Sequence, residues 1–526
     1  MPPEDSRPWD AAYDFIVCGG GTSGCVVARR LAENPAVRIL LLEAGDDERI
    51  DAVRNPTQWM SNIGSTRDWQ FEAEPSAALL GRRTSLPMGK VLGGGSSING
   101  LIWARGHKHD FDGWAEQSGD DGWSYASVLE IYKRIENWDG PQDPERRGRN
   151  GPVYITRPAD PIPLTGALME AAAAAGIPAV EDLNGAAMES AGCCGIPNIT
   201  VKAGDQRVSM ASAYLRPVMS QTNLKVLLRA EVLRLRLEGM RVVAVEFTHD
   251  GAVHRVRADC EVILCLGAIN TPKALMLSGI GDAHQLSRLK IPVVQHLPGV
   301  GQNFQDHILV AGCVWEYRVP EKPRNNSAEF TFFCKSGPDL RTPDLQPVLE
   351  ECAFGSEITR AEYSLPTNPA AAWTLAPGLV RPESRGHIEL TSAKPGAHVA
   401  IHANFLSDDR DVRALKAAVE LCREIGNSPP VRRFVRRELM PGPLSVADME
   451  QWLRRASGTY FHQSCTAKMG RDAESVVDGS LRVYGVQGLR VADGSVMPAI
   501  TTGNTMAPCV MIGERAADLL LTAHRA

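Results

Sequence analysis

Residues 13–24 read YDFIVCGGGTSG, a short apolar run that leads directly into a cluster of glycines. The next residues, CVVARRLAEN, place Val27 and Leu31 four positions apart, as on one face of a helix, and a second apolar run covers residues 37–42. The order strand, glycine turn, helix, strand is typical of a parallel sheet that is buried on both faces. The sequence therefore predicts an α/β fold, α+β overall, that begins with a Rossmann-like unit.

The glycines match the dinucleotide-binding pattern GxGxxG at Gly19, Gly21 and Gly24. The first permits a tight turn, the second lets the backbone approach a pyrophosphate, and the third lets the helix pack closely on the strand. Amides at the helix N-terminus then face the phosphate oxygens. Glu43, at the end of the second apolar run, is placed to accept hydrogen bonds from ribose hydroxyls. The pattern predicts a dinucleotide without choosing between NAD and FAD.

The middle of the chain has a different periodicity. Residues 233–237 alternate strictly between Leu and Arg, residues 242–247 are rich in strand formers, and 238–239 and 250–251 have turn sequences. This pattern predicts an antiparallel meander with one solvated face. A continuous apolar strand follows at residues 261–266.

The C-terminal half predicts a second sheet, with strands at 387–390 and 398–402, and an amphipathic helix at 410–425. A last strand at 489–492 precedes a helix over 505–523. We therefore expect a nucleotide domain assembled from separate segments and interrupted by a substrate domain. The predicted division is 1–155, 195–306 and 479–526 for the first domain, and 156–194 and 307–478 for the second.

Composition excludes several classes of function. The 526 residues have a net charge of −6 and no basic run, which argues against nucleic-acid binding through phosphate neutralisation. No segment approaches the ~20 apolar residues of a membrane span. The first residues, MPPEDSRPWD, carry acids before any apolar stretch, so we expect no secretory signal. The 12 scattered cysteines lack a CxxC pair, which favours reduced thiols in a cytoplasmic protein and no metal site.

Four further segments carry a family resemblance. GKVLGGGSSIN at 89–99, GAINTP at 267–272, PGVGQNFQDH at 298–307 and GNTMAP at 503–508 resemble motifs of the glucose–methanol–choline flavoprotein oxidoreductases. The resemblance runs from about Tyr13 to Leu521. It implies FAD as cofactor, a flavin-binding domain, and a substrate domain built on an antiparallel sheet with helices.

The resemblance also implies which residues hold FAD. Some family members attach FAD through a histidine just before the motif asparagine, but Ile98 occupies that position here, so we predict non-covalent FAD. Asp493 corresponds to a contact with the flavin-side phosphate or ribityl chain, although a cap of a turn is the alternative. The predicted cofactor residues are Gly19, Gly21, Thr22, Ser23, Gly24, Glu43, Ala44, Gly89, Val91, Gly94, Ser96, Asn99, Gly100, Val232, Gly267, Asp493, Gly494, Asn504, Thr505 and Met506.

His462, in the segment YFHQSCTAKMG, is the predicted catalytic residue by resemblance, either as the base or as an electrostatic clamp on the developing alkoxide. Removal of the hydroxyl proton makes an alcohol a far better hydride donor, and a histidine is suited to accept that proton. The family's second active-site position is Asn504, which can donate a hydrogen bond to the alcohol oxygen. Phe461 and Trp373 are candidates for lining the substrate pocket. The sequence thus predicts oxidation of a primary alcohol to an aldehyde with hydride transfer to flavin N5, and it favours an uncharged alcohol over choline.

Other functions stay open at this point. Relatives on the same scaffold include a hydroxynitrile lyase, which keeps the flavin without net oxidation, and a light-driven decarboxylase, which needs no alcohol-activating histidine. A NAD-dependent dehydrogenase or a non-catalytic binding module would leave the later motifs without a purpose. The electron acceptor, either oxygen or a quinone or dye, leaves no linear pattern.

Overall fold

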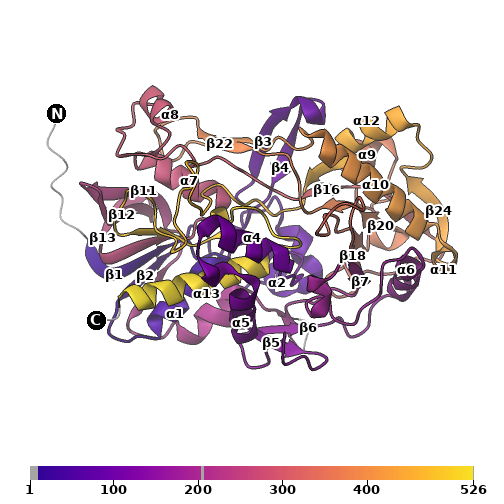
Figure 1. The fold of residues 1–526 in the computed structure, drawn as a ribbon, viewed down its shortest axis with the longest axis horizontal. Helices are drawn as coiled ribbons and strands as arrows, with labels where there is room; N and C mark the ends of the chain where they lie inside the picture. Colours follow the sequence, from indigo (N-terminus) through magenta and orange to yellow (C-terminus); the bar gives the residue numbers. More distant parts are fainter. Residues whose placement is uncertain (1–9, 203–205, 525–526) are drawn as a thin grey trace.

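The computed structural model describes residues 10–202 and 206–524. Figure 1 shows an elongated molecule with one sheet near each end and loops and short strands between them. The expectation that the chain begins without a secretory signal concerns its first ten residues, of which all but Asp10 lie outside the described residues.

The first sheet combines parallel and antiparallel strands. Its long strand β13 pairs antiparallel with β12 through residues 252–257, and its second half pairs parallel with β1 and β26. The predicted Rossmann-like unit with an antiparallel meander is therefore confirmed. In order across the sheet, the strands are β10 (Leu224–Leu227), β2 (Ile39–Leu42), β1 (Ala11–Cys18), β13 (Ala252–Leu264), β12 (Arg241–His249) and β11 (Glu231–Glu238), and β26 (Leu489–Val491) is added beside β13.

Helices α1 (Thr22–Ala32) and α13 (Met506–Ala523) lie side by side along this sheet, as Figure 1 shows for the yellow C-terminal helix. They come very close at Gly513, where an added Cβ would lie 2.9 Å from the Cβ of Val26. The first and last parts of the chain thus build one layer. The predicted helices at the glycine turn and at the C-terminus are confirmed.

The second sheet is antiparallel, as the family resemblance implied. Among the described residues its order is β24 (Val435–Met440), β17 (Val314–Tyr317), β20 (Ala372–Ala376), β19 (Val348–Glu350), β18 (Thr331–Phe333) and β7 (Cys193–Gly195). Helix α10 (Asp409–Gly426) buries its apolar residues on this side and contacts α12 (Val446–Ala456). The amphipathic helix predicted at 410–425 is therefore confirmed.

The strands predicted at 387–390 and 398–402 do not join that second sheet. They are β22 (His387–Leu390) and β23 (Val399–His402), which form a two-stranded sheet of their own. This hairpin contacts α7 (Gly267–Leu277) and β3 (Phe71–Ser76), so it lies against the nucleotide-binding part. Only alternate residues of each strand are buried, which suits a hairpin with one covered face better than a strand inside a larger sheet.

None of the helices in the described part of the chain has both the length and the apolar character that a bilayer span requires. The elements not yet named are short. They are the helices α2 (Asp51–Arg54), α3 (Gly95–Ile98), α4 (Lys108–Ser118), α5 (Tyr125–Ile135), α6 (Pro163–Ala174), α8 (Ala283–Arg288), α9 (Glu357–Glu362) and α11 (Pro429–Arg432), and the strands β4 (Arg82–Leu86), β5 (Glu136–Asp139), β6 (Val153–Thr156), β8 (Val201–Lys202), β9 (Gln206–Arg207), β14 (Ile280–Gly281), β15 (Gln295–His296), β16 (Ile308–Val310), β21 (Gly378–Leu379) and β25 (Ser457–Thr459).

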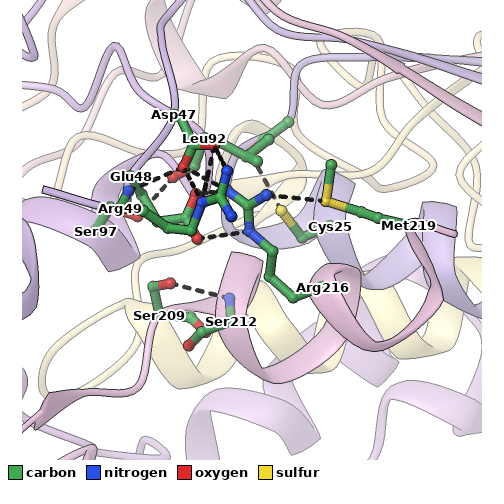
Figure 2. Close-up of polar contacts among 11 residues, drawn as sticks. Cys25, Asp47, Glu48, Arg49, Leu92, Ser97, Ser209, Ser212, Arg216 and Met219 are labelled. Carbon is green, nitrogen blue, oxygen red and sulfur yellow. Dashed lines mark hydrogen bonds and ion pairs between the residues drawn. The ribbon is translucent and has the colours of Figure 1, made fainter.

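An ion-pair cluster fixes the loop that follows β2. Figure 2 shows the guanidinium of Arg216 between Asp47 and Glu48. Arg216 binds Glu48 through two parallel contacts, Nε to Oε1 at 3.0 Å and a terminal nitrogen to Oε2 at 2.6 Å. Two-point contacts of this kind fix both position and orientation. The cluster therefore holds the loop after Glu43 against the segment around residue 216.

Candidate active site

A cavity of about 240 Å³ lies between the glycine turn and the second sheet. It is far larger than the ~15 Å³ that holds one buried water, so it can hold an organic ligand. The segments that were predicted separately from sequence meet around it. Its walls include Gly19, Glu43, Gly94, Gly267, Phe461, His462, Asp493 and Asn504.

The glycine turn forms a cradle that side chains would fill. A Cβ on Gly24 would lie 1.9 Å from the carbonyl oxygen of Gly19, so the helix can approach the strand only with glycine there. Gly94 has φ +54°, and a Cβ on it would lie 2.7 Å from the Cα of Gly21. The N-cap of helix α1 is Gly21, which has no side chain to cap the helix, so the first amides are left for an anion. These residues fit the diphosphate of a dinucleotide.

Glu43 has the surroundings expected of a ribose-binding carboxylate. Its two oxygens accept hydrogen bonds from the backbone N–H groups of Gly20, at 2.8 Å, and Gly45, at 2.7 Å. Each oxygen has a second lone pair that can accept from a hydroxyl. Burial raises the pKa of Glu43 to about 7, and the two backbone hydrogen bonds oppose that rise.

Asp493 lines the cavity and also serves as the cap that sequence reasoning left open. Its carboxylate accepts from the backbone N–H of Ser495 at 2.8 Å, from Gly267 N–H at 2.9 Å and from the hydroxyl of Thr271 at 2.6 Å. These bonds join the end of β26 to the first turn of α7. Asp493 therefore fixes the backbone of two cavity walls relative to one another.

The structure brings most of the predicted cofactor residues to the cavity. Gly24 lies behind the cradle, Val91 is fully buried, and Val232 lines a smaller pocket that shares Ala44 and Leu266 with the cavity. The residues that do line the cavity are Gly19, Gly21, Thr22, Ser23, Glu43, Ala44, Gly89, Gly94, Ser96, Asn99, Gly100, Gly267, Asp493, Gly494, Asn504, Thr505 and Met506.

His462 lies at the other end of the cavity in a chain of polar side chains. Its Nε2 is 3.2 Å from the amide nitrogen of Asn504, and its Nδ1 is 2.9 Å from Nδ1 of His307. Only 9% of His462 is exposed. Burial lowers the pKa of His462 to about 3, so the imidazole is neutral at physiological pH.

The orientation of Asn504 decides the protonation of His462. The side-chain oxygen of Asn504 accepts a hydrogen bond from Nε2 of Gln346 at 3.0 Å, so its NH₂ group faces His462. An amide donor leaves His462 Nε2 as the acceptor, and the ring proton then lies on Nδ1 and is donated to His307. His462 therefore presents an unprotonated nitrogen at the cavity.

Sequence reasoning missed three residues that support this arrangement. His307 and Asp306 lie in the motif at 298–307, which indicates the family but does not indicate what these two residues do. Nothing in the sequence distinguishes Gln346 from other glutamines. Asp306 accepts hydrogen bonds from the backbone N–H of His462 at 2.9 Å and from Gln463 Nε2 at 3.1 Å. Burial raises the pKa of Asp306 to about 7.

The two predicted pocket aromatics differ in their outcome. Phe461 lines the cavity next to His462. Trp373 does not reach the cavity, which corrects the sequence-based expectation: it is fully buried and stacks on Trp315 with ring centroids 4.4 Å apart. The two rings face each other because β17 and β20 pair with these residues directly opposite.

The fold and the cavity define the class of protein as a dinucleotide-dependent oxidoreductase with a histidine beside the substrate space. The family model for GMC oxidoreductases matches residues 13–309 with its N-terminal part and 382–513 with its C-terminal part. The chain belongs to the GMC oxidoreductase family. It is an FAD-dependent alcohol oxidoreductase, as predicted.

Three known proteins illustrate the similarity. Human choline dehydrogenase, a mitochondrial protein, is 37% identical over 97% of this chain and 89% of its own length. The oxygen-dependent choline dehydrogenase of Vibrio vulnificus is 38% identical over 97% of this chain and 94% of its own. The crystal structure of pyridoxine 4-oxidase from Mesorbium loti is similar with a TM-score of 0.92 at 31% identity, covering 98% of this chain and 100% of that one.

Proposed function

We propose that the protein oxidises a primary alcohol to an aldehyde, with His462 as the proton acceptor and Asn504 as the residue that orients the alcohol oxygen. FAD, when bound, accepts the hydride. The observation that carries the proposal is the 3.2 Å contact between His462 Nε2 and Asn504 at the cavity. A hydroxyl inserted there donates its hydrogen bond to the imidazole nitrogen and accepts one from the amide.

The surrounding residues keep this pair ready for a neutral hydroxyl. Gln346 holds the amide of Asn504 in the donor orientation, and Nδ1 of His307 accepts a hydrogen bond from the Nδ1–H of His462. Asp306 fixes the backbone of His462. Because each member is held by a neighbour, substrate binding requires little reorganisation, which is the condition for efficient general-base catalysis.

We also propose the division of the chain and the mode of cofactor binding as predicted from sequence. Residues 1–155, 195–306 and 479–526 form the FAD-binding domain, and residues 156–194 and 307–478 form the substrate domain. FAD is bound without a covalent link through residue 98, because Ile98 lines the cavity with a side chain that has no nucleophile. Heat or acid denaturation tests this point: yellow cofactor should appear in the supernatant, and colour retained on the precipitate contradicts it.

Anaerobic flavin reduction by a panel of primary alcohols tests the reaction itself. The flavin absorbance should bleach with alcohol and return on admission of air or a quinone, and the faster of the two acceptors identifies the natural type. His462→Ala should slow reduction by about two to four orders of magnitude while FAD stays bound. His398→Ala, at an exposed position of the hairpin loop, is the matched control and should reduce normally. Near-normal reduction in His462→Ala would remove His462 from the mechanism.

A further inference from the structure

Glu350 is a buried carboxylate on the wall of the active-site cavity. It ends strand β19, where side chains alternate between the two faces, so Val348 and Glu350 line the cavity while Leu349 is fully buried in the core. Only 6% of Glu350 is exposed, and its Oε2 has no hydrogen-bond partner among the described residues. A buried carboxylate that lacks a partner is costly, and it is retained where a ligand completes it.

The neighbourhood supplies no positive charge for this carboxylate. No Lys, Arg or His of the described chain forms an ion pair with Glu350, and the ionisable groups that act on it or feel its charge are Glu351, Cys352 and Tyr460. The hydroxyl of Tyr460 already donates to the carbonyl oxygen of Gln346. Burial accordingly raises the pKa of Glu350 to about 8.

Apolar side chains surround the rest of this end of the cavity. They form one cluster that includes Leu309, Ala328, Val348 and Tyr460, all of which line the cavity. These apolar residues alone would be enough to bind the alkyl or aryl part of an uncharged alcohol. The carboxylate oxygen therefore indicates a second polar group on the substrate, one that carries a hydrogen-bond donor.

We propose that Glu350 binds a protonated amine on the substrate, so that the enzyme prefers primary alcohols with an N–H-bearing cation at the far end. The inference rests on the proposed alcohol oxidation and narrows its substrate class. In the free enzyme the raised pKa keeps Glu350 protonated at neutral pH. A bound ammonium supplies the compensating charge that lets the carboxyl ionise, and also a donor to Oε2; such a charge-assisted hydrogen bond is roughly twice as strong as a neutral one. A quaternary ammonium has no N–H, so it leaves Oε2 without a donor.

The short segment from Gln346 to Glu350 also limits the spacing between the two polar ends of the substrate. Val348 and Glu350 lie on the same face of β19 and line the cavity, and Gln346, two residues before β19, contacts Asn504 at the catalytic end. Because an extended chain spans at most about 3.3 Å per residue, the backbones of Gln346 and Glu350 are at most about 13 Å apart. The side chains of both ends take up part of that length, so no more than several methylene groups, packed along Val348, separate the hydroxyl from the ammonium.

The experiment uses the FAD-bound enzyme and two matched series of substrates. The first series is linear α,ω-amino alcohols of three to eight carbons, and the second is n-alkanols with the same number of heavy atoms. Anaerobic flavin reduction gives the ratio of kcat/KM between each pair. In the wild type the ratio should exceed about tenfold at one optimal length, and Glu350→Gln should lower that ratio by about 10- to 100-fold.

Glu351→Gln is the control, because Glu351 directly follows β19, is also buried and does not line the cavity. It should leave the ratio unchanged. As a second readout, n-butylammonium, which cannot be oxidised as an alcohol, should bind the wild type in calorimetry and bind Glu350→Gln at least tenfold more weakly.

The outcomes separate this inference from the proposed function. If n-alkanols and amino alcohols reduce the flavin equally well, or if the preference survives in Glu350→Gln, the role of Glu350 is overturned while alcohol oxidation stands. An equal preference for the N-trimethyl counterparts also overturns it, because those lack the N–H donor. If no alcohol of either series bleaches the flavin, the proposed function itself fails.

Discussion

The buried carboxyl of Glu350 should contribute a loss of stability as pH rises, and Glu350→Gln should remove that contribution. Burial raises the pKa of Glu350 from 4.5 to about 8. Below pH 4.5 the carboxyl is protonated in both the folded and the unfolded chain. Between these two values the unfolded chain loses the proton and the folded chain keeps it, so the stability contributed by the protonated form is progressively lost.

The size of the effect follows from the width of this pH window. Each pH unit inside it changes the free energy of unfolding by about 1.4 kcal/mol, so the wild type should lose about 3 kcal/mol relative to Glu350→Gln between pH 5 and pH 7.5. Unfolding entropies of about 2 cal/mol/K per residue give about 1 kcal/mol/K for a chain of this length. The difference in Tm between the two proteins should therefore change by about 3 °C.

Thermal unfolding of both proteins with saturating FAD, followed by circular dichroism at half-unit pH steps, measures this change. Glu145→Gln is the control, because the side chain of Glu145 is 82% exposed and should contribute no comparable slope. The Tm of Glu350→Gln minus the Tm of the wild type should increase steadily from pH 5 to pH 7.5. If the two curves stay parallel, Glu350 ionises in the folded protein as it does in water, and the argument from burial is refuted.

Two further substitutions test the framework of the site. Gly24→Ala should abolish or strongly weaken FAD binding, because the added Cβ would lie 1.9 Å from the oxygen of Gly19. The flavin-to-protein absorbance ratio measures this loss. The control is Gly113→Ala, which should bind FAD normally because nothing lies within 4 Å of its added Cβ. Glu136→Gln should lower the free energy of unfolding by about 3–5 kcal/mol in denaturant titrations, because it removes the carboxylate that the buried guanidinium groups of Arg105 and Arg147 share and leaves Arg147 only Asp182. Unchanged stability in Glu136→Gln would show that the two arginines find other acceptors.

The cofactor side of the cavity could be predicted from sequence because its determinants are local. Gly19, Gly21 and Gly24 lie within six residues, and a Cβ on Gly24 would lie 1.9 Å from the oxygen of Gly19 inside that turn. Glu43 follows from the length of one helix and one strand. Such constraints can be recognised in a single stretch of chain. Almost all of the predicted cofactor residues do line the cavity.

The substrate side could not be predicted in the same way, because its contacts depend on how distant strands pair. Gln346 reaches Asn504 and Glu350 reaches the cavity only because β19 is placed inside the second sheet. Trp373 is a candidate pocket residue by sequence, yet the pairing of β17 with β20 places it against Trp315 in the core. An isolated Glu or Trp in a sequence gives no sign of which face of a strand it will occupy.

The low pKa of His462, about 3, has a consequence for the order of bond breaking. A separate proton transfer would create an imidazolium in a cavity where burial opposes charge, so that ion is stable only while the negative alcohol oxygen lies beside it. We therefore expect the O–H and C–H bonds to break together, and flavin reduction to be slowed both by D₂O and by deuteration of the carbinol carbon. The two isotope effects should multiply in the doubly labelled experiment. A solvent isotope effect of one, with a full effect from carbon deuteration, would mean that the proton leaves first in a fast equilibrium and that the buried imidazolium is more stable than its surroundings suggest.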